Sequence, residues 1–237
     1  MSHRRWAALR RQGVGLSDLL LGSRCAGCGT AGPSWCLSCH RVLRTGPLAV
    51  EHVAGTSDAV TLVAAASYDT VVRAGIVAHK DHGRWGLARP LATALAPAVA
   101  ALLAASGGEG GDVLLVPVPS TGPAVRSRGY DHALALARHA AADLRREGVA
   151  AGAAAVLALS GGGQVGLGGT ARRANRRGSM RVRHGRLPAP LVADGCRVVV
   201  VDDIATTGAS VAEAARVLRD AGAEVVGAAV VARVRVR

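Results

Sequence analysis

Apolar runs that fit buried strands alternate along the chain with segments that have the apolar spacing of helices. Short, continuously apolar runs predict strands at 60–67, 113–118, 156–159, 197–201 and 225–231. The segments that predict helices between them are 70–78, 86–105, 131–146 and 210–221. Because parallel strands need crossover connections, which are usually helices, this alternation predicts an α/β fold with a mainly parallel sheet.

Less regular segments divide the chain into a small and a large part. Residues 4–21 have the pattern of a short amphipathic helix, and residues 46–58 have that of a linker. We therefore expect a small module at 1–50 and a larger domain at 56–237, which is long enough to bury one ordinary core. Inside the larger domain, the polar segment 79–83 predicts a loop.

The longest apolar stretch, 91–105, does not predict a membrane span. It is shorter than the roughly 18 residues that a spanning helix needs, and Pro97 interrupts it. The basic N-terminus precedes an apolar segment that Asp18 breaks and that lacks a small-residue cleavage site, which argues against a signal peptide. We expect a cytoplasmic protein.

Composition indicates a folded chain whose core contains few aromatic residues. Of the 237 residues, 50% are hydrophobic and 19% are charged, which excludes a disordered chain. Aromatic residues make up only 2%, so the core has to be built from alanine, valine and leucine. The same scarcity weakens an assignment to proteins that stack single-stranded bases on aromatic side chains.

The net charge of +13 is concentrated in two segments. Residues 1–50 contain seven arginines and one acidic residue, and residues 172–197 contain eight arginines and one acidic residue. This concentration indicates sites for anions such as phosphates or nucleic acid. A general preference for arginine is the alternative, since Lys80 is the only lysine, but such a preference does not explain the clustering.

Four of the five cysteines form two Cys-x-x-Cys pairs, Cys25 with Cys28 and Cys36 with Cys39. Four thiolates presented from two tight turns match a tetrahedral Zn²⁺ site, which would be structural because no ligand position is left open. Two disulfides are disfavoured because nothing else indicates secretion, and a redox pair is disfavoured because two copies lie so close together. Cys196 stands alone at the start of an apolar strand and is interpreted as a core residue.

The strongest chemical signal is a buried strand that delivers Asp202 and Asp203 to its end and is followed by the start of a helix. In an α/β sheet, ligands bind at the carboxyl ends of the strands. Backbone amides at a helix start, together with nearby hydroxyl groups, can hold a phosphate. The residues of this cradle are Ile204, Ala205, Thr206, Thr207, Gly208, Ala209 and Ser210. Because carboxylates beside such a cradle suit sugar hydroxyls, the segment predicts a site for a phosphorylated ribose.

Two other nucleotide sites are excluded by their motifs. A P-loop ATPase needs a lysine after its second glycine, whereas Lys80 follows a histidine. Gly-x-Gly-x-x-Gly occurs at 27–32 and 161–166, but the first copy lies among the cysteines. The second copy is followed neither by an apolar helix nor by an acidic residue about twenty positions later, as a dinucleotide site requires.

The segment from Val198 to Ser210 resembles the PRPP-binding signature of type I phosphoribosyltransferases. With the other motifs, in this order, essentially the whole chain resembles the competence-protein ComF family. These motifs are the two Cys-x-x-Cys pairs, Val116–Pro119, Arg126–Ala133, Gln164–Leu167 and Arg172–Asn175. The resemblance implies a type I phosphoribosyltransferase sheet with helices on both faces and an N-terminal zinc finger. It also implies a link to natural transformation and the uptake of single-stranded DNA.

The motifs that carry the resemblance also suggest which residues bind the diphosphate of PRPP. The strand at 113–118 ends in a stiff turn whose backbone amides can meet pyrophosphate, with a plain strand-ending turn as the alternative. The turn consists of Pro117, Val118, Pro119 and Ser120. Arg126 and Arg128 can clamp phosphate oxygens, unless they form a solvated face. Lys80 is a further candidate for a phosphate contact.

Residues 164–177 correspond, by the same resemblance, to the flexible loop that closes over PRPP and excludes water. The loop residues that we single out are Gln164, Gly166, Leu167, Arg172, Arg173 and Asn175. The two arginines can neutralise the leaving pyrophosphate, and we count them with Asp202 and Asp203 as catalytic candidates. Nucleic acid could use the same arginines.

Two functions of different classes fit these features. The first is a Mg²⁺-dependent phosphoribosyltransferase that binds PRPP and transfers its phosphoribosyl group to an acceptor that stays open. The second is a non-catalytic accessory or regulatory module of DNA import that keeps the PRPP pocket and binds single-stranded DNA, with competence or DNA-processing proteins as partners. The complete acidic and Thr-Thr-Gly signature favours the enzyme, and the zinc module and basic segments favour the accessory. A homodimer is left open.

Overall fold

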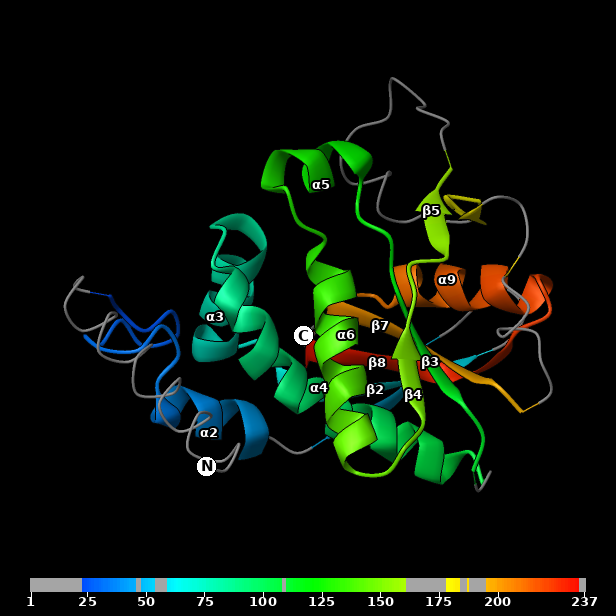
Figure 1. The fold of residues 1–237 in the computed structure, drawn as a ribbon, viewed down its shortest axis with the longest axis horizontal. Coiled ribbons are helices and arrows are strands. Elements are labelled where there is room, and N and C mark those ends of the chain that lie inside the picture. The colour runs from blue at the N-terminus through cyan, green and yellow to red at the C-terminus, as the bar shows by residue number, and fades with distance from the viewer. Residues whose placement is uncertain are drawn as a thin grey trace, which may run out of the picture.

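The chain is described by a computed structural model over residues 23–45, 48–53, 59–107, 110–160, 178–183, 187 and 195–234. A six-stranded sheet lies at its centre (Figure 1). In spatial order its strands are β1 (Ala49–Val53), β2 (Val60–Ser67), β8 (Glu224–Arg233), β7 (Arg197–Ala205), β3 (Val113–Pro117) and β4 (Ala151–Ala153). The strands pair in parallel except for β1, which is antiparallel to β2. The predicted mainly parallel α/β sheet is confirmed.

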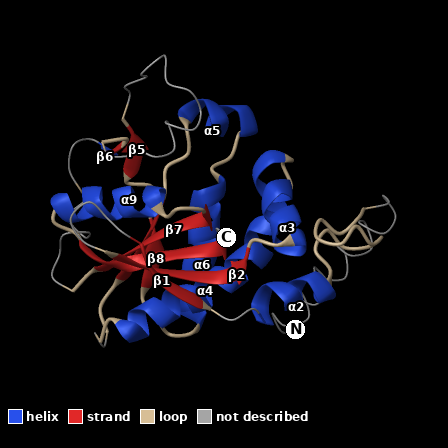
Figure 2. Cartoon of the chain, turned by 180° about the vertical axis from the view of Figure 1, so that it is seen from behind, coloured by secondary structure: helices blue, strands red, loops and turns tan. Residues whose placement is uncertain are grey.

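Helices cover both faces of this sheet (Figure 2). The helices are α2 (Leu37–Thr45), α3 (Thr70–Asp81), the 3-10 helix η1 (Trp85–Leu87), α4 (Ala88–Ala105), α5 (Gly122–Arg128), α6 (His132–Arg146) and α9 (Ala209–Asp220). Helices α4 and α6 pack on one face and α9 on the other. A small antiparallel pair, β5 (Leu157–Leu159) with β6 (Met180–Val182), lies beside α9.

Each face of the sheet has its own core of alanine, valine and leucine, as the composition predicts. Along β7, Val199 and Val201 face the core of α4 and α6, whereas Val198 and Val200 face the core of α9. Side chains of a strand alternate between the two faces. The alternation continues to the end of β7 and sends the next two residues, both aspartates, to opposite sides of the sheet.

Several boundaries differ from the sequence predictions. The helix predicted at 70–78 continues to Asp81, so the loop predicted at 79–83 is wrong for its first three residues. Part of the predicted linker, Ala49–Val53, pairs with β2 as an edge strand, because its backbone groups find partners there. Short elements without a strong periodic pattern escaped prediction, namely α2, α5, β4 and β6. The amphipathic helix predicted at 4–21 lies outside the described residues.

One described helical segment, Trp85–Ala105, has the length and apolar composition needed to cross a membrane. Within this molecule, 61% of its apolar window is buried, and α4 packs against β8, β2 and α6. Pro97 lies inside α4 and does not end the helix. We interpret the segment as the central core helix of the sheet's first face.

Candidate active site

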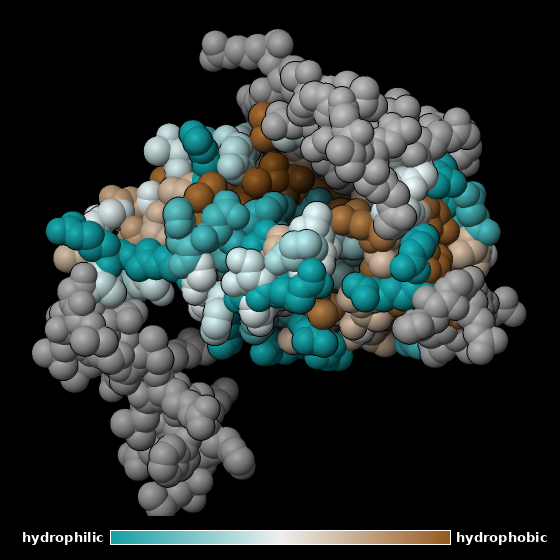
Figure 3. Space-filling model, turned by 90° about the horizontal axis from the view of Figure 1, so that it is seen from above, coloured by the Kyte–Doolittle hydropathy of each residue, from teal (hydrophilic) through white to brown (hydrophobic). Residues whose placement is uncertain are grey.

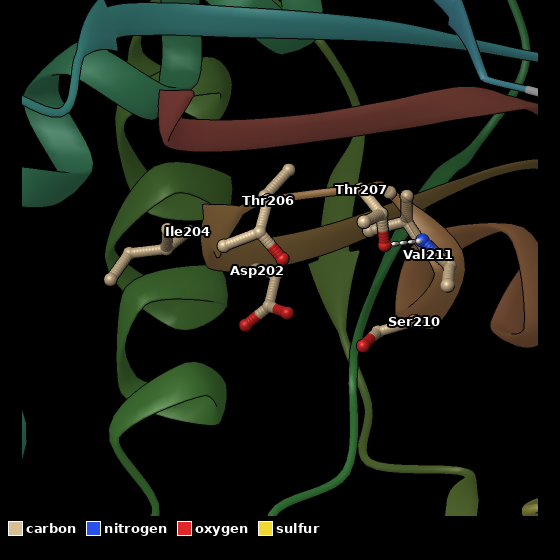
Figure 4. A pocket seen from close by; sticks show the side chains of 9 residues that line it. Asp202, Ile204, Thr206, Thr207, Ser210 and Val211 are labelled. Carbon is tan, nitrogen blue, oxygen red and sulfur yellow. Dashed lines mark hydrogen bonds between the residues drawn. The ribbon is translucent and has the colours of Figure 1, made fainter. Parts of the chain in front are cut away.

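A small hollow lies where β7 ends and α9 begins (Figure 4). It is lined by Asp202 and residues 204–211 and has a volume of about 90 Å³. The oxygen atoms of Asp202, Thr206, Thr207 and Ser210 face this common space, whereas Ile204 points away from it. Because pockets for whole ligands usually measure about 300–1,000 Å³, the hollow suits a single group such as a phosphate.

The loop that forms the hollow depends on Gly208, which precedes the first turn of α9. Its φ angle of +79° lies in the left-handed region, and an added Cβ would come within 2.4 Å of Val53 Cγ1. Thr207 Oγ1 accepts a hydrogen bond from the amide of Ala209 at 3.3 Å. The helix start therefore presents amides and a positive dipole end to the hollow, which favours an anion.

The two adjacent aspartates lie in different surroundings. Asp202 is half-buried and lines the hollow, while Asp203 is 1% exposed and does not. Desolvation and the neighbouring charge of Asp203 raise the pKa of Asp202 well above its usual range. The sequence pattern predicts that both carboxylates face ribose hydroxyls, but of the two only Asp202 lines the hollow.

Asp203 is held by two side chains from other elements. Lys80 Nζ, on α3, lies 2.9 Å from Oδ2 and 3.2 Å from Oδ1, and His132 Nε2, on α6, lies 3.3 Å from Oδ2. Burial acts to raise the pKa of Asp203, but the hydrogen bond from His132 and the charge of Lys80 outweigh it and lower that pKa. Burial likewise acts to lower the pKa of Lys80, and Asp203 raises it. Both groups are therefore charged near neutral pH.

The turn at 117–120 lies next to Asp202, because Pro117 pairs with Val201 of β7. The amide of Val118 donates to the carbonyl of Val201 at 2.9 Å, so the sheet occupies it. The prolines at 117 and 119 carry no amide hydrogen. Among the four turn residues, these restrictions leave the amide of Ser120 free, and the contact of this turn with pyrophosphate stays a prediction.

Helix α5 carries the two predicted arginines and was not itself predicted. Arg126 is exposed, whereas Arg128 is half-buried and donates through Nη1 to His132 Nδ1 at 2.9 Å. Figure 3 looks onto the side of the molecule that carries α5 and shows hydrophilic surface beside a recessed apolar area. The structure therefore brings Arg128, but not Arg126, into contact with the group around Asp203.

Three aromatic rings near this group had no predicted role in the site. His79 is 1% exposed, and its Nε2 lies 2.7 Å from the hydroxyl of Tyr130, whose ring stacks on Trp85 at 5.7 Å. Burial lowers the pKa of His79 to about 4 and raises that of Tyr130 to about 12, so both are neutral. The loop predicted at 79–83 is wrong for His79, because α3 carries this residue into the core. The feature of the sequence that could have pointed to His79 is its position directly before Lys80.

The loop residues predicted at 164–177 lie outside the described part of the chain. They are Gln164, Gly166, Leu167, Arg172, Arg173 and Asn175. The described chain resumes at Gly178, whose amide donates to the buried Glu213 of α9 at 2.7 Å. Gly178 is therefore tied to the helix whose start forms the hollow.

A second cluster consists of the four N-terminal cysteines, whose sulfur atoms all lie within 4.8 Å of one another. Cys25 and Cys39 are 3.6 Å apart, and Cys28 and Cys36 are 3.7 Å apart. Zn–S bonds of about 2.3 Å in a tetrahedron place sulfurs about 3.8 Å apart, so the cluster fits Zn²⁺. A disulfide needs an S–S distance of about 2.05 Å, and all four cysteines are free.

The cysteine segment packs directly on α3. Trp35 lies against Gly75, where an added Cβ would come within 2.5 Å of its ring, and Leu43 of α2 is fully buried in the core of the sheet. Arg84 donates to the carbonyl of Arg24 at 2.8 Å. The cysteine segment thus supports the helix that carries Lys80.

Comparison with known families agrees with this geometry. No curated protein matches the chain. The family model described as the phosphoribosyl transferase domain matches residues 130–237, which contain α6, β7, α9 and β8. The match includes Asp202, Asp203 and all residues that line the hollow, and it begins after Lys80 and the turn at 117–120. The C-terminal part of the chain is thus similar to the phosphoribosyl transferase domain.

Proposed function

We propose that the protein is a Mg²⁺-dependent phosphoribosyltransferase that binds PRPP and transfers or releases its phosphoribosyl group. The observation that carries this proposal is the hollow between β7 and α9, where Asp202 stands beside a hydroxyl-lined helix start. A phosphate at the helix start brings the attached ribose next to the carboxylate. The match of residues 130–237 to the phosphoribosyl transferase domain supports the same assignment.

The residues of the chain would act mainly by positioning. Thr206, Thr207 and Ser210 hold the 5′-phosphate, and Asp202 accepts hydrogen bonds from ribose hydroxyls. Lys80 and Arg128 stand near the end of β3 and stabilise the negative charge that develops on the departing diphosphate. Mg²⁺ prefers carboxylate and phosphate oxygens, so Asp202 and the diphosphate of the substrate fit it, and it would supply further charge neutralisation.

The cysteine cluster would hold a structural Zn²⁺ that keeps residues 23–40 folded against α3. The proposal is supported by the tetrahedral spacing of the sulfurs. Hydrogen bonds with Thr30 lower the pKa of Cys28 to about 6, which favours the thiolate that zinc requires. Free cysteines also fit a reducing compartment, in keeping with a cytoplasmic location.

A second candidate function, a DNA-import accessory linked to competence, draws its support from exposed basic residues beside the cysteines. Arg24, Arg41 and Arg44 are exposed on this segment and α2. Such a surface suits a phosphate backbone, with binding that weakens steeply as salt concentration rises. The few aromatic residues predict weak binding of single strands at best.

The proposed transferase activity is tested by incubation of the purified protein with PRPP and Mg²⁺ in the presence of a panel of bases and amines. We expect release of pyrophosphate, measured by a coupled phosphate assay, and its acceleration by one class of acceptor. Calorimetry measures PRPP binding separately. Binding without release in every mixture would favour the non-catalytic alternative, and a failure to bind PRPP would reject the transferase.

Protection from trypsin distinguishes the two functions at residues 164–177. If Arg172 and Arg173 contact the diphosphate, PRPP with Mg²⁺ should slow cleavage after them at least several-fold, since a bound ligand shields the scissile bonds. If these arginines bind DNA instead, a single-stranded oligonucleotide should protect them, and this protection should fade with salt. Mass spectrometry of the fragments locates the cuts. Protection by neither ligand would contradict both roles.

A further inference from the structure

A buried histidine for which the sequence pattern predicts no role connects the cations near the end of β3. His132, at the start of α6, is 3% exposed. Its Nε2 lies 3.3 Å from Oδ2 of Asp203, and its Nδ1 lies 2.9 Å from Nη1 of Arg128. Ser120 Oγ is 3.5 Å from the same Nδ1. The imidazole therefore lies between β7, the end of α5 and the turn after β3.

The partners of His132 determine which nitrogen carries its hydrogen. An arginine side chain contains only donors, so Nδ1 accepts the hydrogen bond from Arg128. In a neutral imidazole the other nitrogen then carries the hydrogen, and Nε2 faces the carboxylate of Asp203 as a donor. A proton on Nδ1 would place an N–H donor opposite the N–H donor of Arg128. His132 thus lies as a bridge between the guanidinium of Arg128 and the carboxylate of Asp203.

The same carboxylate fixes the second cation. Asp203 is 2% exposed at its side chain, whereas Lys80 is 32% exposed, so the ammonium reaches outward from a buried anchor. Lys80 comes from α3 and Arg128 from α5, and nothing in the local sequence sets the distance between them. The pair of Asp203 and His132 sets their relative positions, because Lys80 contacts Asp203 and Arg128 contacts His132.

We propose that His132 is a positioning residue for a bound diphosphate group: it holds Arg128 directly and Lys80 through Asp203. The inference rests on the proposed function, which supplies the diphosphate as the leaving group of PRPP. Charges that are held in place before the ligand arrives stabilise it better than free side chains, because no reorganisation is needed. Asp203 accordingly serves as the anchor of Lys80, and Asp202 as the ribose ligand.

Two probes that represent the two ends of PRPP test whether Asp202 and the group around Asp203 have these separate roles. Calorimetry measures the affinities of inorganic pyrophosphate with Mg²⁺ and of ribose 5-phosphate for the wild type, His132→Leu and His132→Gln. The leucine removes the contacts with Arg128 and Asp203, and the glutamine keeps a donor for Asp203. We expect His132→Leu to lower the pyrophosphate affinity roughly 3- to 10-fold, as the loss of a hydrogen bond predicts. Ribose 5-phosphate affinity should stay within about twofold, and His132→Gln should regain most of the loss.

Different results overturn the proposed function and the positioning role of His132. A wild type that binds neither probe nor PRPP overturns the proposed function itself. If the wild type binds both probes, an equal loss for the two, or an unchanged pyrophosphate affinity in His132→Leu, overturns the positioning role alone. Should His132→Leu fail to fold, His132→Asn replaces it, because its shorter amide can still accept from Arg128 but leaves Asp203 without its donor. The same selective loss of pyrophosphate affinity is then expected.

Discussion

Replacement of Asp202 by asparagine should lower the affinity for PRPP roughly 10- to 100-fold. Hydrogen bonds to a charged group contribute about 1.5–3 kcal/mol, and asparagine removes the charge while keeping the shape. The fold should survive, because burial raises the pKa of Asp202, which means that its charge costs stability in the folded state. The melting temperature should therefore be equal to or higher than that of the wild type, while calorimetry records the loss of affinity.

Asp220→Asn is the matched control for this change. Asp220 ends the same helix, α9, is 63% exposed at its side chain and pairs with Arg216, far along the helix from the hollow. Its replacement should leave the PRPP affinity unchanged. An unaltered affinity in Asp202→Asn, with a normal melting temperature, would remove the ribose role of this carboxylate. Acid should weaken binding in the wild type more than in the variant, because the raised pKa of Asp202 brings its protonation to higher pH.

Replacement of Cys25 by serine should abolish stoichiometric zinc binding. The wild type should carry about one Zn²⁺ per chain, since the four sulfurs can complete a tetrahedral site, and three thiolates hold the ion far less tightly. Residues 23–40 should then lose their fold, because metal binding supplies the folding free energy of such small segments. Trp35 reports this loss through its fluorescence, since it packs against Gly75 of α3.

Cys196→Ser is the control for the zinc experiment, because Cys196 is a buried core residue outside the cluster. It should retain the full zinc content, measured by atomic emission of the dialysed protein. A wild type that is folded, free of metal and rich in titratable thiols would reject the zinc site. The larger sheet should persist in Cys25→Ser, with lower stability, because Leu43 and Trp35 pack on its first core.

Most of the sheet was predictable because its signals are local and strong. The run 197–201 is continuously apolar and leads to two aspartates and a Thr-Thr-Gly loop, so strand, site and helix follow from one segment of the chain. The cysteine spacing by itself likewise predicts a metal site, because a single tight turn presents the two thiols of each Cys-x-x-Cys pair. Weak or short patterns, such as those of α5 and β4, have no comparable signal and depend on partners distant in the sequence.

Tertiary structure decided what each charged residue contacts. The sequence places Asp202 and Asp203 side by side, but the alternation of β7 sends one to the hollow at the start of α9 and the other to Lys80 and His132. These two partners stand 123 and 71 positions from Asp203, so no local pattern could join them. Burial of a charge requires compensating partners, and only the packing of α3 and α6 against the sheet supplies them. The sequence by itself was therefore sufficient to identify the two aspartates, whereas the different surroundings of Asp202 and Asp203 depended on the fold.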